Sequence, residues 1–596
     1  MSASSLPAWR VIWSAIRFRP LYWVFNFVSM MILMLFLQVP GLVMRHFFNI
    51  LSGDAAAAFG IWTIIGFLFA GELVRMSAIL GLIITNVPFW VHTMTLFRRN
   101  LLKHILQRPG ASALPDSPGE AVSRFRGDVF EIPLFALWLN DLMGLLLFSA
   151  IAIIIMVRIN AAITLVAIAP FILVGLISNA TSKKVEQYRQ VSRRHAGIVS
   201  GFIGELFGAA QAIKVATAEK EVVGHFKRLN AERRTVSLKD ILFNEILRSI
   251  FHNTATIGTG IILILIGQAM QQNTFTVGDF VLFVFYLDYI GELTAFLGLL
   301  VARYKQIGVS VERMQRLMEG ADSDALIKPD PIYLKDDLPD IKNIPKTDQT
   351  KLHELSTRSL SYTFPTSGKG IQDINLSIPR GSFTVITGMN GSGKTSLLRV
   401  LLGLLPKDSG DIMWNSEIVQ DPGAFFVPPR AAYTSQVPRL FSESLENNIL
   451  MGLSGKEADI QGAIRSAVIE TDIANMENGL QTMIGPKGVK LSGGQMQRTA
   501  AARMFVRDPE LLVFDDLSSA LDVETEQTLW KRVFEKEGTT CLVVSHRKAA
   551  LRRANHIIVL KDGIIESEGM LDDLLKQSSE LRKIWYGSDQ EKPEIA

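Results

Sequence analysis

The sequence has 596 residues and a formal net charge of +4, from 61 Lys and Arg against 57 Asp and Glu. A chain of this length is expected to form at least two domains, and the small net charge argues against a surface for nucleic acid. Its one cysteine, Cys541, excludes an intrachain disulfide and a cysteine-based metal site. In the run TTCLVVS, Cys541 is expected to be a small buried strand residue.

Residues 1–20 place arginines among the apolar residues Trp9, Val11, Ile12, Trp13 and Ile16. This pattern predicts an amphipathic helix on the cytoplasmic surface of a membrane. A targeting peptide is the alternative, but no short apolar core with a small-residue cleavage site follows.

Residues 21–310 contain apolar stretches of about 20 residues, which is long enough to cross a bilayer and contact membrane lipid. Six candidate spans are roughly Leu21–Met44, Phe59–Ile84, Leu134–Val157, Ala161–Ile177, Ile250–Met270 and Phe275–Val301. Six such stretches cannot be hidden in one soluble core. We therefore expect an all-α membrane domain with six helices.

Lys and Arg residues concentrate in the two long connections that follow the second and fourth spans. By the positive-inside rule, these connections and both termini are expected in the cytoplasm, with the spans in the plasma (inner) membrane of a bacterium. Helical periodicity in Val185–Arg194 and Ile203–Phe226 predicts that the spans continue below the membrane as helices.

Four ionisable residues lie within the spans, where an uncompensated charge costs several kcal/mol. Glu72 and Arg75 are three residues apart on one helical face and can neutralise each other. Asp288 and Glu292 are four apart on the last span. They form either an acidic face in a transport cavity or a structural pair satisfied by other spans.

Composition changes again after the membrane half. Residues 311–350 are charged and rich in proline (KPDPIYLKDDLPDIKNIPK), which predicts an exposed linker. A domain of mixed composition follows, at residues 351–590.

The stretch ITGMNGSGKTS in this domain has the G-x-x-x-x-G-K-[ST] spacing of a phosphate-binding loop between a strand and a helix. Glycines let backbone amides point at phosphate oxygens, and the N-terminus of the helix favours the same anion. Lys394 would reach the β- and γ-phosphates, and the Thr395 hydroxyl would ligate Mg²⁺. The residues expected to bind nucleotide here are Gly388, Asn390, Gly391, Ser392, Gly393, Lys394, Thr395 and Ser396.

Four further residues lie at strand ends where they could complete the site. Tyr362 in LSYTFP could stack on adenine, and Gln436 in YTSQ could turn its amide toward Mg²⁺ and the attacking water. Asp515 ends the strand LLVFD and is suited to hold Mg²⁺. His546 ends CLVVSH, within reach of a γ-phosphate.

The stretch LSGGQMQR offers a second anion-binding site at the start of a helix. Its expected contacts are Ser492, Gly493, Gly494 and Gln495.

In this order and spacing, the motifs resemble those of the ATP-binding cassette (ABC) transporter family, in the exporter-type half-transporters that fuse six spans to one cassette. The resemblance implies an α/β phosphate-loop NTPase cassette that binds ATP and Mg²⁺ and couples ATP hydrolysis to transport. It also implies that two chains pair head to tail, so that the signature Leu491–Gln495 of one caps ATP on the other. Coupling helices are expected near Ser117–Asp128 and Phe207–Lys220.

Two residues depart from the family pattern. Asp516 stands where the family usually has the catalytic glutamate, so its carboxylate is about 1.5 Å shorter in reach and weak hydrolysis at this site is expected. Met483 replaces a common acidic residue, which puts its contact with the coupling loops in doubt. A heterodimer with a second half-transporter is slightly favoured over a homodimer.

The function expected from the sequence is an ATP-driven exporter that works by alternating access. A nucleotide-gated channel or regulatory membrane protein stays open as an alternative because of Asp516, as does an importer with an exporter-like fold. The sequence does not identify the transported substrate.

Overall fold

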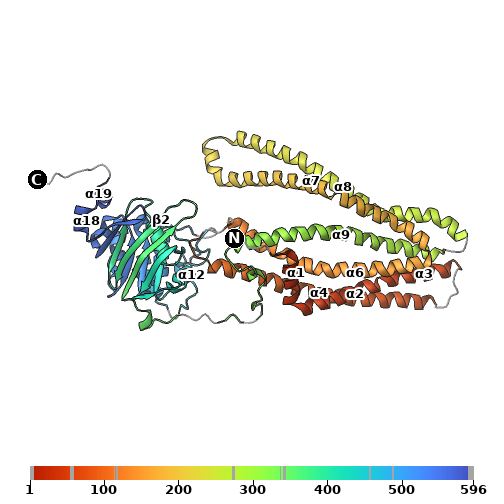
Figure 1. Cartoon of the computed structure of the whole chain (residues 1–596), viewed down its shortest axis with the longest axis horizontal. Coiled ribbons are helices and arrows are strands. Elements are labelled where there is room, and N and C mark those ends of the chain that lie inside the picture. Colours follow the sequence, from red (N-terminus) through yellow and green to blue (C-terminus); the bar gives the residue numbers. More distant parts are fainter. Residues whose placement is uncertain are drawn as a thin grey trace. The chain divides into compact units, whose positions relative to one another are not determined.

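The computed structural model describes residues 6–53, 60–112, 115, 118–271, 275–335, 337–339, 344–455, 458–485 and 489–587. The chain divides into two compact units, which Figure 1 shows in sequence colours. The first comprises Met1–Ile105 and Leu114–Asp337, and we call it the membrane unit. The second comprises Leu106–Ala113 and Leu338–Ala596, and we call it the cassette unit. The predicted architecture, a helical membrane domain followed by an α/β cassette, is confirmed.

All the regular secondary structure described in the membrane unit is helical. Its helices are α1 (Ala8–Phe18), α2 (Pro20–Phe36), α3 (Gln38–Leu51), α4 (Ile61–Gln107), α5 (Pro118–Ser123), α6 (Val129–Ile159), α7 (Ala161–Val215), α8 (Glu219–Gln271) and α9 (Val277–Leu317), with a π-helical turn at Arg124–Asp128.

Helices long and apolar enough to span a membrane cover four of the six predicted spans: Pro20–Leu51, Trp62–Gln107, Gly119–Ile159 and Val277–Leu317. The predicted fourth span begins α7, where Ala161–Leu173 is a shorter apolar helix in the described part of the chain. The predicted fifth span lies on α8, but most of its side chains are outside the described residues, so it stays a prediction.

Helices α7 and α8 lie side by side along much of their length, as the yellow pair in Figure 1 shows. Each is helical far beyond the length of a single span, but Gln187–Val215 on α7, predicted to lie below the membrane, is itself long and apolar enough to span one. A short turn separates Val215 from Glu219, so the predicted coupling region Phe207–Lys220 falls at this hairpin.

Helix α1 is amphipathic, as predicted. Its buried side chains are Val11, Ile12, Ala15 and Ile16. They pack against α6 and α9 of the same chain, while Trp9 and Trp13 remain 59% and 58% exposed. The apolar face is thus covered by protein, and the two tryptophans form the outer side.

The prediction of an exposed linker is wrong for its first part. Helix α9 continues to Leu317, with Val311, Met314 and Leu317 buried, and Leu326 beyond it is also buried. These residues continue an apolar helical stripe through a charged stretch, so the charge did not mark the end of the packed unit. The described residues 333–335, 337–339 and 344–349 are exposed, as a linker should be.

The charged pair within the second span is formed as predicted. Arg75 Nη1 lies 2.6 Å from Glu72 Oε1. Asp288 and Glu292 are both exposed on α9 of the single chain, and their role stays a prediction.

The cassette unit contains two sheets. A four-stranded antiparallel sheet has the order β2-β1-β4-β5, and a six-stranded sheet has the order β10-β9-β3-β8-β7-β6, parallel except for β10. The strands are β1 (Glu354–Thr363), β2 (Gly370–Pro379), β3 (Phe383–Thr387), β4 (Ser409–Trp414), β5 (Glu417–Ile418), β6 (Ala431–Thr434), β7 (Leu511–Asp515), β8 (Thr540–Val544), β9 (His556–Lys561) and β10 (Ile564–Gly569). Cys541 is fully buried on β8, as predicted.

Helices cover the parallel strands, and their apolar residues form two core clusters. The helices of the cassette unit are α10 (Lys394–Leu401), α11 (Pro422–Phe425), α12 (Leu445–Leu450), α13 (Ile460–Ser466), α14 (Glu470–Ala474), α15 (Gly493–Phe505), α16 (Val523–Val533), α17 (Lys548–Arg553), α18 (Leu571–Gln577) and α19 (Ser579–Tyr586). The loops after β3, β6, β7 and β8 meet at one edge of the sheet, because parallel strands place their carboxyl ends together.

The first predicted coupling segment, Ser117–Asp128, stays a prediction. Within the cassette unit, Ala111 N donates to Leu404 O over 2.8 Å. Of the predicted Ser117–Asp128, Ser117 lies outside the described residues, and Ala121 and Asp128 are buried in the membrane unit.

Candidate nucleotide-binding site

The phosphate loop connects the buried strand β3 to helix α10, as predicted. Gly388 has a φ of +145°, and a Cβ there would lie 2.1 Å from Leu560 O. Gly393, the N-cap of α10, has a φ of +100°. Only glycine meets both requirements without strain, so the backbone is free to approach an anion.

Two side chains of this loop are buried but poised for a ligand. Ser392 is 5% exposed, and its Oγ has no hydrogen-bond partner among the described residues. Lys394 Nζ donates to the carbonyl oxygens of Gly388 and Met389, over 2.8 and 2.9 Å. Burial lowers the pKa of Lys394, while the nearby carboxylates, Asp515 first, act in the opposite direction. A bound phosphate could accept a hydrogen bond from Ser392 Oγ and place a negative charge beside Lys394.

Two of the three predicted magnesium ligands, Thr395 and Asp515, meet. Thr395 Oγ1 donates to Asp515 Oδ1 over 3.0 Å, and Tyr433 OH donates to Asp515 Oδ2 over 3.3 Å. Burial raises the pKa of Asp515, and the hydrogen bonds from Thr395 and Tyr433 oppose this rise. A hydroxyl at the end of the phosphate loop and a carboxylate at the end of β7 are oxygen ligands of the type that Mg²⁺ prefers.

Asp516 and Gln436 also meet. Gln436 Nε2 donates to Asp516 Oδ2 over 3.3 Å. Asp516 has a φ of +54°, and its backbone N donates to Val544 O on the neighbouring strand over 3.0 Å. Burial raises the pKa of Asp516, while the Gln436 hydrogen bond lowers it. The carboxylate therefore lies in a setting where it could accept a proton.

These residues line one cavity of about 280 Å³, together with Gly391, Gly393, Lys394 and His546. Burial, followed by the positive charge of Lys394, lowers the pKa of His546. Its ring is therefore neutral at pH 7 and can accept or donate a hydrogen bond.

The assignment of Tyr362 as the stacking residue is corrected by the structure. Tyr362 is 6% exposed on β1, within the apolar core of the cassette unit, and it does not line the cavity. Phe364, two residues later, lines the cavity instead, and its ring packs edge-on against Tyr362. Strand β1 ends at Thr363, so Phe364 leaves the sheet and turns toward the phosphate loop.

The second predicted anion site begins helix α15 and does not line the cavity. Ser492 Oγ accepts from Gln495 N over 3.2 Å, and Gln495 Oε1 accepts from Ser492 N over 2.9 Å, which is a capping box. Ser492 and Gly493 are exposed. The two predicted anion sites therefore do not share one cavity in the described chain.

Sequence reasoning missed three residues near the loop: Phe364, Tyr433 and Glu580. Glu580 on α19 is 7% exposed and accepts a long hydrogen bond, 3.4 Å, from Met389 N in the phosphate loop. The position of Phe364 directly before Pro365 was a usable signal, because a proline ends a strand. Nothing local marks Glu580, which lies almost two hundred residues away in sequence.

A membrane-spanning helical unit and a phosphate-loop unit in one chain define a nucleotide-driven membrane transporter. Residues 20–292 match the family described as ABC transporter transmembrane region, and residues 371–519 match the family described as ABC transporter. The chain belongs to the ABC transporter family, with the two domains of an exporter-type half-transporter, and it is an ATPase coupled to transmembrane transport.

Two relatives and one solved structure are consistent with this family assignment. The chain is 26% identical over 526 residues to a probable multidrug resistance ABC transporter ATP-binding/permease protein of Bacillus subtilis (strain 168), with 85% of each chain covered. It is 25% identical over 508 residues to an ATP-dependent lipid A-core flippase of Vibrio vulnificus (strain CMCP6), with 82% of each covered. A bacterial Atm1-family ABC exporter solved with ATP bound has the same fold, with a TM-score of 0.73, 19% identity, and 98% and 99% coverage.

Proposed function

We propose that this chain is one half of a dimeric, ATP-driven exporter that works by alternating access. The observation that carries the proposal is the separation of the two anion sites. The cavity at Lys394 holds no signature residue, and Ser492 lies exposed elsewhere on the cassette unit. A nucleotide bound at the phosphate loop therefore needs a second chain to be enclosed.

In this proposal, different residues of the chain bind ATP and hydrolyse it. Backbone amides of the phosphate loop and Lys394 hold the β- and γ-phosphates, and Phe364 stacks on the adenine. Thr395 and Asp515, with Gln436 as the third expected ligand, would hold Mg²⁺, which would neutralise developing charge on the phosphates. Asp516 accepts a proton from the attacking water, Gln436 orients that water, and neutral His546 contacts the γ-phosphate.

The membrane setting follows from charge. Lys and Arg in the two long connections favour a bacterial inner membrane with the cassette and both termini in the cytoplasm. A heterodimer is slightly favoured over a homodimer, because Asp516 in both sites would leave no site with the usual catalytic carboxylate. The names of the relatives, one a multidrug transporter and one a lipid flippase, favour an amphipathic cargo.

The oligomeric state of the purified transporter tests this proposal. Native mass measurement of the purified transporter in detergent should show two half-transporters per particle. Ser492→Arg would place a long cation in the second anion site, so it should stop ATP turnover while leaving ATP bound at the chain's own phosphate loop. A monomer with full ATPase activity would contradict the proposal.

A further inference from the structure

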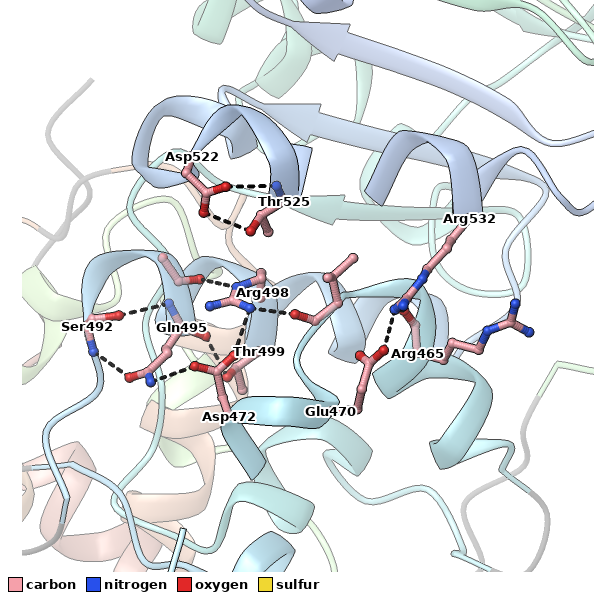
Figure 2. A network of polar contacts seen from close by, with 12 residues as sticks. Arg465, Glu470, Asp472, Ser492, Gln495, Arg498, Thr499, Asp522, Thr525 and Arg532 are labelled. Carbon is pink, nitrogen blue, oxygen red and sulfur yellow. Dashed lines mark hydrogen bonds and ion pairs between the residues drawn. The ribbon is translucent and has the colours of Figure 1, made fainter. Parts of the chain in front are cut away.

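Asp472 lies beside the signature helix and binds two of its residues. Its Oδ1 accepts from Gln495 Nε2 over 2.9 Å, and its Oδ2 lies 2.7 Å from Arg498 Nη1. Figure 2 shows the carboxylate between these two side chains. The side chains of Arg498 and Asp472 are only 15% and 22% exposed, so this ion pair is screened less by water than a surface pair.

Gln495 connects Asp472 to Ser492 through hydrogen bonds. One end of its amide, Nε2, is held by Asp472, and the other end, Oε1, accepts from Ser492 N over 2.9 Å. Both ends of the amide are therefore used, and the side chain is fixed in one orientation (Figure 2). Ser492 Oγ in turn accepts from Gln495 N, so the hydroxyl of the N-cap is set by the same residue.

Glu470 lies two residues before Asp472 but binds a different element. Its Oε1 accepts from Arg532 Nη1 on α16 over 2.6 Å, and Arg532 also donates to Arg465 O. Among the described residues, Glu470 makes no hydrogen bond or ion pair with Ser492 or Gln495. The two acids of α14 thus belong to separate networks in Figure 2, which makes Glu470 a matched control for Asp472.

We propose that Asp472 is a positioning residue for the composite ATP site. Acting through Gln495, it holds the Ser492 hydroxyl and the first amides of α15 in the geometry that receives the γ-phosphate of a nucleotide bound to the partner chain. This inference rests on the proposed function, in which the signature completes the partner's site. Asp472 itself contacts no nucleotide.

The position of Asp472 has a kinetic consequence. The chain's own phosphate loop does not depend on Asp472, so nucleotide affinity there should be unaffected. Closure of the two cassettes and the turnover that follows do depend on the signature, and a misplacement of about 1 Å can cost on the order of 100-fold in rate. Loss of Asp472 should therefore lower kcat and leave binding of nucleotide to the open state unchanged.

The test uses the full-length transporter, assembled with its partner half if the chain requires one. Asp472→Ala, Asp472→Asn and Glu470→Gln are compared for steady-state ATPase and for binding of a fluorescent ATP analogue in the absence of turnover. Asp472→Ala should lower kcat by tenfold to on the order of 100-fold, with analogue affinity within about twofold of wild type. Glu470→Gln should change both by less than about twofold.

A compensating pair separates positioning from general stability. In Asp472→Asn the new amide can donate a hydrogen bond, and in Gln495→Glu the new carboxylate can accept it while still capping Ser492 N. The double variant should recover several-fold of the activity lost in Asp472→Asn. Equal losses in Asp472→Ala and Glu470→Gln, or no recovery in the double variant, would overturn the inference.

Ser492→Arg separates failure of the positioning role of Asp472 from failure of the proposed dimeric function. If Ser492→Arg stops turnover and Asp472→Ala does not, the positioning role of Asp472 is wrong and the composite site stands. If Ser492→Arg leaves turnover intact, the proposed dimeric function itself is wrong.

Discussion

Gln436 Nε2 donates a hydrogen bond to Asp516 Oδ2 over 3.3 Å. The two residues follow β6 and β7, which are neighbours in the parallel sheet, so the contact is set by the sheet itself. The amide proposed to orient the attacking water is thus held on the carboxylate proposed to deprotonate it. That carboxylate is one methylene shorter than the glutamate usual in the family, about 1.5 Å.

Variants at Asp516 give opposite results for the two possible assemblies. In a homodimer, turnover should be slow, Asp516→Asn should nearly abolish it, and Asp516→Glu should raise it by restoring the reach of the base. In the favoured heterodimer, Asp516→Asn should change total ATPase little. Steady-state ATPase of the purified chain alone decides between them, because appreciable Asp516-dependent turnover without a partner would contradict the heterodimer.

Removing the ring of Phe364 should weaken nucleotide binding. Stacking of a base on an aromatic ring contributes about 1–3 kcal/mol, so Phe364→Ala should lower ATP affinity by on the order of tenfold, and Phe364→Tyr should retain it. Tyr362→Phe is the matched control, since it keeps the buried ring and should leave affinity unchanged. Titration with a fluorescent ATP analogue measures all three, and an unchanged affinity in Phe364→Ala would contradict stacking by Phe364.

Most of the site could be predicted from the sequence because its chemistry is carried by short, contiguous motifs. Lys394, Thr395 and Asp515 lie at strand ends that the apolar runs mark clearly, and the parallel sheet brings them together. The assignment of Tyr362 was wrong because the two-residue periodicity of a strand does not show which of two aromatic residues leaves the sheet. Phe364 does so only because β1 ends at Thr363.

Contacts between segments far apart in the chain could not be predicted from the sequence. Residues 311–326 read as a linker from their charges, but Met314 and Leu317 are buried against helices from distant parts of the chain. Asp472 is likewise unremarkable in sequence, and its importance comes only from its contacts with Gln495 and Arg498. Charge and periodicity describe a segment, whereas packing depends on what lies opposite it.

Tyr433→Phe should weaken the magnesium site without disturbing the fold. Burial raises the pKa of Tyr433 to about 12, so its phenol stays protonated at neutral pH and donates to Asp515. A hydrogen bond of this kind contributes about 1 kcal/mol. The variant should therefore need several-fold more Mg²⁺ for ATPase and bind Mn²⁺ several-fold more weakly by magnetic resonance. Unchanged Mn²⁺ affinity would show that Tyr433 does not position Asp515.

Gly278→Ala should destabilise the membrane unit. Gly278 N donates to Asn49 Oδ1 over 2.9 Å, and a Cβ at Gly278 would lie 2.1 Å from Arg45 O. Overpacking of this kind costs about 1–3 kcal/mol. Gly298→Ala on the same helix is the control, since a Cβ there meets nothing within 4 Å in the described chain. Thermal unfolding in detergent should show a lower midpoint for Gly278→Ala alone, and equal midpoints would contradict the packing argument.

The most direct test of ATP-driven export is vectorial transport into inverted membrane vesicles, with wild type beside Lys394→Ala. Lys394→Ala removes the cation that reaches the β- and γ-phosphates, whereas Lys576→Ala, an exposed lysine on α18, is the control. Vesicles are offered a fluorescent amphipathic dye and a labelled lipid A-core. The account predicts ATP-dependent accumulation of at least one probe above its outside concentration, lost in Lys394→Ala and kept in Lys576→Ala. A probe that enters on ATP addition but only equilibrates would contradict export and indicate a channel.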